Sequence, residues 1–201
     1  MKVKTLFAGI LAGAGLACYL YNRSRAHKAP LDPVHPFDPE KFMGKWYEWA
    51  RLDNCFERNL NNTSAHYALN PNGTIRVVNK GYNQVTHEHR KATGTAKFTG
   101  PKDIGALEVS FFGPFYSDLT VLAVDKQYKH ALLAGRNLDY LWILSRDTSF
   151  PDKLLDHFLE IAVEAGYDVD KLIRIDHDHV VDPGGSSVVS KAIQQIFAPR
   201  G

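Results

Sequence analysis

The sequence has little of what several common protein classes require. It contains two cysteines, Cys18 and Cys55, in segments of quite different character, so a disulfide framework is not the expected source of stability. Its 24 Lys and Arg residues nearly balance 22 Asp and Glu residues. That balance gives no excess of positive charge of the kind that nucleic-acid binders use, so nucleic acid is not an expected partner. A chain of 201 residues, 44% of them apolar, is long enough to bury one core by packing alone.

Long apolar runs are also scarce, and the one present lies at the N-terminus. Two lysines precede apolar residues 5–21 and two arginines follow them, a pattern typical of an export signal or a membrane anchor. The small residues before Cys18 resemble a bacterial lipoprotein processing site, whose cysteine is diacylated. The apolar residues after Cys18 depart from that site. Lipidation of Cys18 and an uncleaved signal anchor therefore both stay open, and either would hold the folded part at a membrane.

The remaining chain divides into a tether, a folded domain and a tail. Residues 22–36 are polar, basic and rich in proline, which predicts an extended tether. Residues 37–178 carry the periodic patterns of a folded domain, beginning with a short helical turn around Pro39. Residues 179–201 contain a Pro-Gly-Gly-Ser-Ser stretch, and we expect them to form a flexible tail.

From Gly44 onward the pattern is that of strands. Short runs rich in Val, Ile, Thr, Phe and Tyr alternate with turn residues about every ten positions, as in sandwiches and barrels. Clear turns lie at residues 71–73 and 100–103. The pattern predicts an all-β fold, an eight-stranded antiparallel up-and-down barrel. The predicted strands are residues 45–53, 63–70, 74–83, 88–98, 105–112, 115–125, 128–135 and 138–146.

After the last of these strands the spacing becomes helical. Ser149 is the expected N-cap, Pro151 lies in the first turn, and Gly166 follows the end. The helix has one apolar stripe that must pack on the outside of the barrel, because no second core is available. This stripe consists of Leu154, Leu155, Phe158, Leu159 and Ala162. A last short strand is expected over residues 171–175.

This order of elements resembles the lipocalin family. Gly44-Lys45-Trp46 opens the first strand as the first family motif does, and residues 124–128 and 144–146 are similar to the second and third motifs. Over residues 37–175 the chain is similar to bacterial lipocalins of the outer membrane lipoprotein type, related to apolipoprotein D. The segments that carry this similarity are FERNL, NKGYN, KFTGP, EVSFFGPFY, DYLWILSR and AGYDV.

The resemblance implies how one end of the barrel is closed. In lipocalins an Arg near the end of the eighth strand lies across the Trp of the first strand, so Arg146 should lie over Trp46. A partly desolvated cation–π contact of this kind contributes about 1–2 kcal/mol. The pair is therefore expected to be structural and not catalytic.

Alternation along the strands predicts a ligand site in the interior, which in a barrel of eight strands has room for one small ligand. If Trp46 points inward, Glu48, Ala50 and Leu52 share its face. Each aromatic taken singly is also consistent with core packing. Together they favour an acyl chain, hence a fatty acid or lysophospholipid. The predicted ligand-binding residues are Glu48, Ala50, Tyr67, Tyr82, Phe112, Phe115, Tyr116, Tyr140 and Trp142.

The sequence predicts no metal site and no cofactor. Two His-x-His pairs, at residues 87–89 and 177–179, lack further ligands at a recognisable spacing. Cys55 is the one candidate nucleophile, and Arg58 nearby would lower the pKa of its thiol. An enzyme acting through Cys55 on an oxidised or unsaturated lipid is therefore the alternative to a binding protein that does no catalysis.

The main hypothesis is a lipocalin that binds, stores or transports amphipathic lipid at the bacterial cell envelope. The N-terminal segment indicates an outer membrane lipoprotein facing the periplasm or, alternatively, an inner-membrane signal anchor. A homodimer is compatible with the sequence, and so is a mainly structural envelope protein without a ligand. The ligand's head group does not follow from the sequence.

Overall fold

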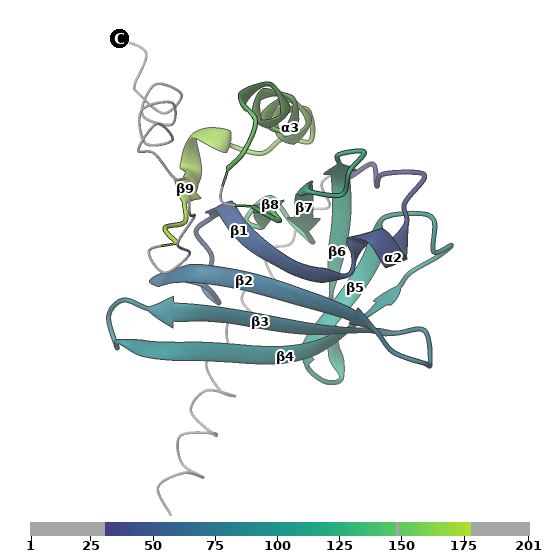
Figure 1. Cartoon of the computed structure of the whole chain (residues 1–201), viewed down its shortest axis with the longest axis horizontal. Coiled ribbons are helices and arrows are strands. Elements are labelled where there is room, and N and C mark those ends of the chain that lie inside the picture. Colours follow the sequence, from purple (N-terminus) through teal and green to yellow (C-terminus); the bar gives the residue numbers. More distant parts are fainter. Residues whose placement is uncertain (1–30, 148, 178–201) are drawn as a thin grey trace, which may run out of the picture.

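Eight antiparallel strands form a closed barrel in the computed structural model, which describes residues 31–147 and 149–177 (Figure 1). Each strand pairs with its neighbour in sequence, and pairing of the first strand with both the second and the eighth closes the barrel. The predicted eight-stranded antiparallel barrel is thereby confirmed. The strands are β1 (Gly44–Leu52), β2 (Leu60–Leu69), β3 (Ile75–Asn83), β4 (Glu88–Phe98), β5 (Ala106–Phe112), β6 (Phe115–Val124), β7 (His130–Gly135) and β8 (Leu141–Ser145).

The helix α3 (Asp152–Glu164) packs outside the barrel, as predicted. Its N-terminus differs from the prediction: Pro151 and not Ser149 is the N-cap, and it makes no side-chain capping hydrogen bond. The residue before a proline is pushed away from helical geometry, so the helix begins only after Pro151. Gly166, with a φ of 91°, follows the end of the helix as expected. A 3₁₀ turn, η1 (Val169–Lys171), then leads into β9 (Leu172–Arg174), which pairs antiparallel with the end of β1.

The chain enters the barrel through a segment that is bound and not free. Val34 of the predicted tether accepts a hydrogen bond from Gly105 and donates one to Val121, at 3.0 and 2.8 Å. Because Val34 also packs against the interior cluster, the extended tether ends before it. The short helix α2 (Pro39–Phe42) follows, with the Asp38 carboxylate accepting from two of its backbone amides.

Two ranges, 1–30 and 178–201, lie outside the described residues. They contain Cys18, the apolar N-terminal run, most of the predicted tether and the predicted tail. In the part of the chain that is described, no helix has the length and apolar character needed to span a membrane.

Strand β1 contributes to two separate buried clusters because its register shifts between Glu48 and Ala50. Before the bulge, Trp46 belongs to the cluster inside the barrel. After it, Ala50 and Leu52 belong to the cluster beneath α3. Arg51 lies opposite Trp142 of β8, whose side chain faces inward. A bulge inserts one residue and so reverses the alternation of faces. The prediction that Ala50 and Leu52 share the face of Trp46 is therefore wrong.

Candidate ligand-binding site inside the barrel

One end of the barrel is closed by the pair that the resemblance implies. The Trp46 side chain is fully buried, and its Nε1 donates to the Phe42 carbonyl at 2.8 Å. The Arg146 guanidinium lies 3.7 Å from the centre of the Trp46 ring, which confirms the expected contact. Burial lowers the pKa of Arg146 to about 10. Its guanidinium nitrogens donate to the carbonyls of Lys41, Phe42, Met43, Lys45 and Tyr128.

Above this closed end the interior is apolar. Tyr67 lies inside as predicted, with its ring 5.1 Å from that of Phe42, and burial raises the pKa of its hydroxyl. Apolar side chains from six other strands belong to the same cluster. They include Ile75, Val77, Ala96, Leu107, Leu119, Val121, Leu133 and Leu144.

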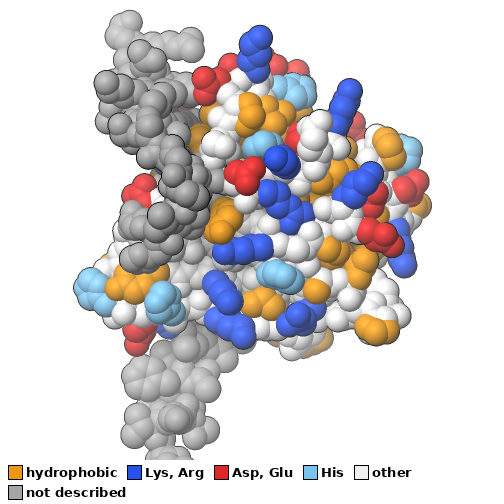
Figure 2. Space-filling view, in the orientation of Figure 1, with side chains coloured by type: hydrophobic (Ala, Val, Ile, Leu, Met, Phe, Trp, Pro, Cys, Tyr) orange, Lys and Arg blue, Asp and Glu red, His pale blue; other side chains and the backbone are white. Residues whose placement is uncertain are grey.

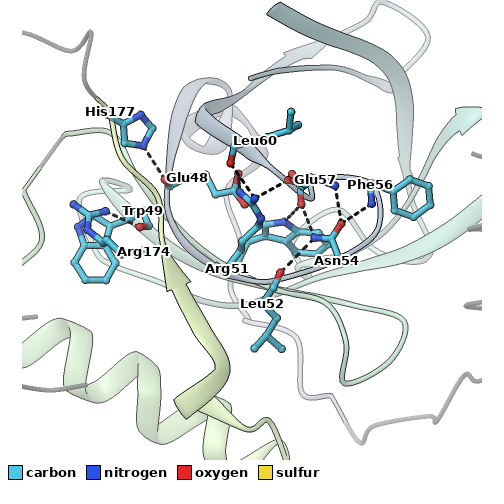
Figure 3. Close-up of polar contacts among 11 residues, drawn as sticks. Glu48, Trp49, Arg51, Leu52, Asn54, Phe56, Glu57, Leu60, Arg174 and His177 are labelled. Carbon is cyan, nitrogen blue, oxygen red and sulfur yellow. Dashed lines mark hydrogen bonds and ion pairs between the residues drawn. The ribbon is translucent and has the colours of Figure 1, made fainter. Parts of the chain in front are cut away.

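A polar cluster follows toward the other end of β1. Glu48 and Arg51 are almost fully buried, with 5% and 1% of their side chains exposed, and Arg51 Nη1 lies 3.4 Å from Glu48 Oε2. Arg51 Nη2 donates to the carbonyls of Glu57 and Leu60, at 2.7 and 3.0 Å. Figure 3 shows Arg51 between Glu48 and the β1–β2 loop, residues 53–59. Arg51 therefore ties this loop to the interior.

The same loop brings a second carboxylate to the cluster. Glu57 Oε2 accepts hydrogen bonds from Trp142 Nε1 at 2.8 Å and from Asn54 Nδ2 at 2.7 Å. Asn54 Oδ1 in turn accepts from two backbone amides of the loop, which fixes its shape. Trp142 is thus an inward-facing aromatic, as predicted, held by a carboxylate that the sequence did not single out.

The electrostatics of the cluster favour a neutral Glu48. Complete burial and the nearby Glu57 carboxylate raise the pKa of Glu48 to about 8, and Arg51 offsets only part of this rise. At neutral pH the Glu48 carboxyl is therefore mostly protonated, and it becomes a hydrogen-bond donor as well as an acceptor.

Several polar atoms of the cluster are buried without a hydrogen-bond partner among the described residues. The 3.4 Å approach of Arg51 Nη1 to Glu48 Oε2 lacks hydrogen-bond geometry, so it leaves donors open. Buried polar groups normally have partners, and an unmade hydrogen bond costs about 1–3 kcal/mol. The cluster can therefore accept the polar end of a ligand. The open atoms are Glu48 Oε1, Arg51 Nε and Nη1, Thr63 Oγ1 and Asn79 Oδ1.

The end of the barrel opposite Trp46, here called the mouth, has an apolar rim. Antiparallel pairing places the β1–β2, β3–β4, β5–β6 and β7–β8 connections at this same end. Large apolar side chains on three of them are exposed: Phe56 by 45%, Val85 by 68%, Phe112 by 43% and Phe115 by 37%. Exposed apolar groups gathered at one opening are typical of a ligand entrance.

The structure brings together some of the predicted ligand-binding residues and not others. Glu48, Tyr67 and Trp142 lie inside, Tyr140 stacks on Trp142 with ring centres 5.8 Å apart, and Phe112 and Phe115 lie at the mouth.

Tyr82 and Tyr116 lie on the outer surface. Tyr82 alternates with the inward residues of β3 and packs against the ring of His89, at 5.2 Å. The ammonium of Lys97 lies 4.4 Å from the centre of the Tyr116 ring. With Ala50 beneath α3, three of the predicted residues are not in the interior.

Sequence reasoning missed Arg51, Glu57, Thr63 and Asn79. Strict alternation from Trp46 places Arg51 outside, and only a bulge brings it in. The clue was the presence of two charged residues, Glu48 and Arg51, among the apolar residues of the second half of β1.

The structure does not support a nucleophilic thiol. Cys55 is disulfide-bonded, and no free cysteine occurs among the described residues. Its Sγ lies 3.9 Å from the Tyr140 hydroxyl. The expectation that the two cysteines form no disulfide framework rested on the different character of their segments, which says nothing of distance in the fold. In this bonded state Cys55 cannot act as a nucleophile.

A hollow of about 770 Å³ lies elsewhere, on the outside of the barrel between α3 and the β6–β7 turn. Its walls include Asp125, His130, His157 and Phe158. It shares no residue with the polar cluster, so it is separate from the interior site.

Comparison with known proteins agrees with this geometry. A family model described as a lipocalin-like domain matches residues 37–177. The chain is 45% identical over 167 residues to outer membrane lipoprotein Blc of Escherichia coli (strain K12), covering 82% of this chain and 94% of that protein. It is 29% identical over 168 residues to apolipoprotein D of Mus musculus, with 77% and 85% covered.

Solved structures show the same fold. Insecticyanin from the tobacco hornworm Manduca sexta superposes with a TM-score of 0.62 at 20% identity, covering 77% of this chain and 88% of that one. The relatives are named as lipocalins or lipoproteins and not as enzymes. The chain belongs to the lipocalin-like family.

Proposed function

We propose that this protein binds an amphipathic lipid, a fatty acid or a lysophospholipid, inside its barrel. The observation that carries the proposal is the division of the interior into an apolar part around Tyr67 and a cluster of buried polar atoms without partners. An amphipathic molecule matches both parts, whereas a wholly apolar ligand leaves the polar atoms unsatisfied.

The two parts contribute differently to binding. Each methylene of an acyl chain that leaves water contributes about 0.8 kcal/mol, so the apolar part supplies most of the affinity. Arg51, protonated Glu48 and Thr63 offer donors to the polar end. The rim of Phe56, Val85, Phe112 and Phe115 supports entry through the mouth.

The protein acts at the bacterial cell envelope under this proposal, as an outer membrane lipoprotein facing the periplasm. Relatives named outer membrane lipoprotein Blc and the charged and apolar pattern of residues 1–25 support this location. Either a diacylated Cys18 or the uncleaved apolar segment provides the tether. Because Cys18 is the other cysteine of the chain, a thioether at Cys18 and an intrachain disulfide at Cys55 exclude each other. The intact mass of the membrane-extracted protein distinguishes these states.

Lipid binding is tested on protein stripped of lipid and titrated with oleic acid or a lysophosphatidylcholine. Native mass spectrometry should find one lipid per barrel. The emission of inward-facing Trp142 should change with saturation at the same stoichiometry. No bound lipid by either method, together with none in an organic extract of the purified protein, would favour a mainly structural envelope protein.

A further inference from the structure

The outer surface of one side of the barrel carries basic side chains without acidic ones. On β2, β3 and β4 the outward positions alternate with buried inward residues such as Tyr67, Val77 and Ala96, and none of them holds Asp or Glu. Figure 2 shows Lys and Arg side chains gathered over β1 to β4. We call this surface the basic face; it consists of Lys45, His66, Arg76, Lys80 and Lys91.

The charges of the basic face repel one another. Lys80 lies directly opposite Lys91. No ion pair within the described residues involves any member of the face. Two ion pairs flank it on β4: Arg90 with Glu88 at 2.9 Å, toward the start of the strand, and Lys97 with Glu108 at 2.8 Å, toward its end. Like charges directly opposite each other destabilise a sheet. The face therefore lowers the stability of the barrel unless an anionic surface covers it.

The near-neutral composition conceals this asymmetry. The acids that balance the basic residues lie elsewhere, and helix α3 alone exposes Asp152, Asp156, Glu160 and Glu164. This helix packs on the outside of β1 and β6 to β8 and not on β2 to β4. Such segregation gives the molecule an electric dipole moment, which its net charge does not reveal.

We propose that the basic face docks on an anionic lipid surface, with the barrel lying on its side. Its charge complements phosphate-bearing headgroups, which attract clustered Lys and Arg. The face lacks the row of exposed aromatics on which single-stranded nucleic acids stack. The docking surface is outside the barrel and the proposed ligand site inside, so either stands without the other.

The test uses the full-length protein and phosphatidylcholine vesicles with or without phosphatidylglycerol. Because the proposed N-terminal tether would hold the protein on both kinds of vesicle, the measured quantity is the increase in partitioning that phosphatidylglycerol causes at low salt. In the variant R76Q/K80Q/K91Q, that increase should be smaller by about tenfold or more. The matched control K126Q/K129Q/K153Q removes three lysines away from the face and should keep it.

Loss of the fold should not be the reason why the face variant partitions less. Removing the repulsion between Lys80 and Lys91 should leave the melting temperature of the face variant equal to or above that of wild type. Oleic acid binding by the same variant should also be unchanged. On vesicles with phosphatidylglycerol, a water-soluble amine reagent should modify Lys80 and Lys91 more slowly than on vesicles without it, and Lys153 at the same rate.

Three results would overturn the proposal. In the first, phosphatidylglycerol increases the partitioning of the face variant as much as that of wild type. In the second, the control variant loses as much of this increase as the face variant does, which would indicate an effect of net charge. The third is retention of the wild-type protein on double-stranded DNA at a salt concentration that abolishes the increase caused by phosphatidylglycerol, which would assign the face to nucleic acid.

Discussion

Each end of the barrel contains an arginine, half-buried Arg146 at the closed end and buried Arg51 toward the mouth, and the two differ in how many of their donors have hydrogen-bond partners. Arg146 lies over Trp46 and donates to five backbone carbonyls. Arg51 donates to two carbonyls and leaves Nε and Nη1 without a hydrogen-bond partner. A cation whose donors are all used holds a structure together, whereas one with donors to spare can bind something. The difference is consistent with closure at one end and with the proposed ligand recognition at the other.

The largest effect is expected at the closed end. Trp46→Ala removes a fully buried indole and the ring beneath Arg146, and should lower the free energy of unfolding by about 3–5 kcal/mol. Urea unfolding measures it. A loss below about 1 kcal/mol would show that the closed end does not depend on this pair.

A pH-dependent effect is expected at the other end. Since the pKa of Glu48 is raised to about 8 in the folded protein, the protonated carboxyl favours the fold. That contribution is fully present below the ordinary carboxyl pKa, decreases as the pH rises toward 8, and is on the order of 2–4 kcal/mol.

Glu48→Gln is the matched variant for this measurement. The glutamine side chain cannot ionise. Between pH 5 and pH 8, the window set by the raised pKa, the free energy of unfolding should therefore decrease much less in the variant than in wild type. Parallel pH profiles for wild type and variant would mean that Glu48 is already ionised in the folded state.

Arg51→Met should show that Arg51 contributes to ligand binding, the role that distinguishes it from Arg146. It removes the spare donors, and affinity for oleic acid should fall by roughly 10- to 100-fold, as expected for a lost hydrogen bond to a charged group. Arg174→Met is the control, because Arg174 lies over Trp49 on the outside, 4.0 Å from its ring centre. Isothermal titration measures both variants. Equal losses of affinity would remove Arg51 from the site.

The smallest effects are expected at predicted residues that lie outside the interior. Tyr82→Ala and Tyr116→Ala should change lipid affinity by less than about twofold, since both side chains lie on the outer surface. A clear loss of affinity in either variant would place the ligand outside the barrel.

The barrel itself was predictable because its signals are local. Turn residues separated the strands, the apolar stripe indicated an external helix, and the motif positions located Trp46 and Arg146. The site was harder to predict, because a single bulge after Glu48 decides which face Arg51 takes. No periodicity signals one extra residue.

The remaining differences between prediction and structure depend on contacts between residues that are distant in sequence. The carboxylate of Glu57 reaches Trp142 across 85 positions of sequence. The basic face consists of residues from four strands and is invisible in a balanced count of charges. Val34 joins the barrel by hydrogen bonds that a proline-rich composition does not indicate.

The central claim is that the ligand lies inside the barrel with its polar end toward Arg51. The most direct test is quenching of tryptophan emission by a brominated fatty acid in Trp49→Phe, which keeps the two inward-facing tryptophans, Trp46 and Trp142. The claim predicts quenching that saturates at one lipid per barrel, and weaker binding in the Trp49→Phe/Arg51→Met double variant. Stoichiometric binding without quenching would place the lipid outside the barrel and contradict the claim.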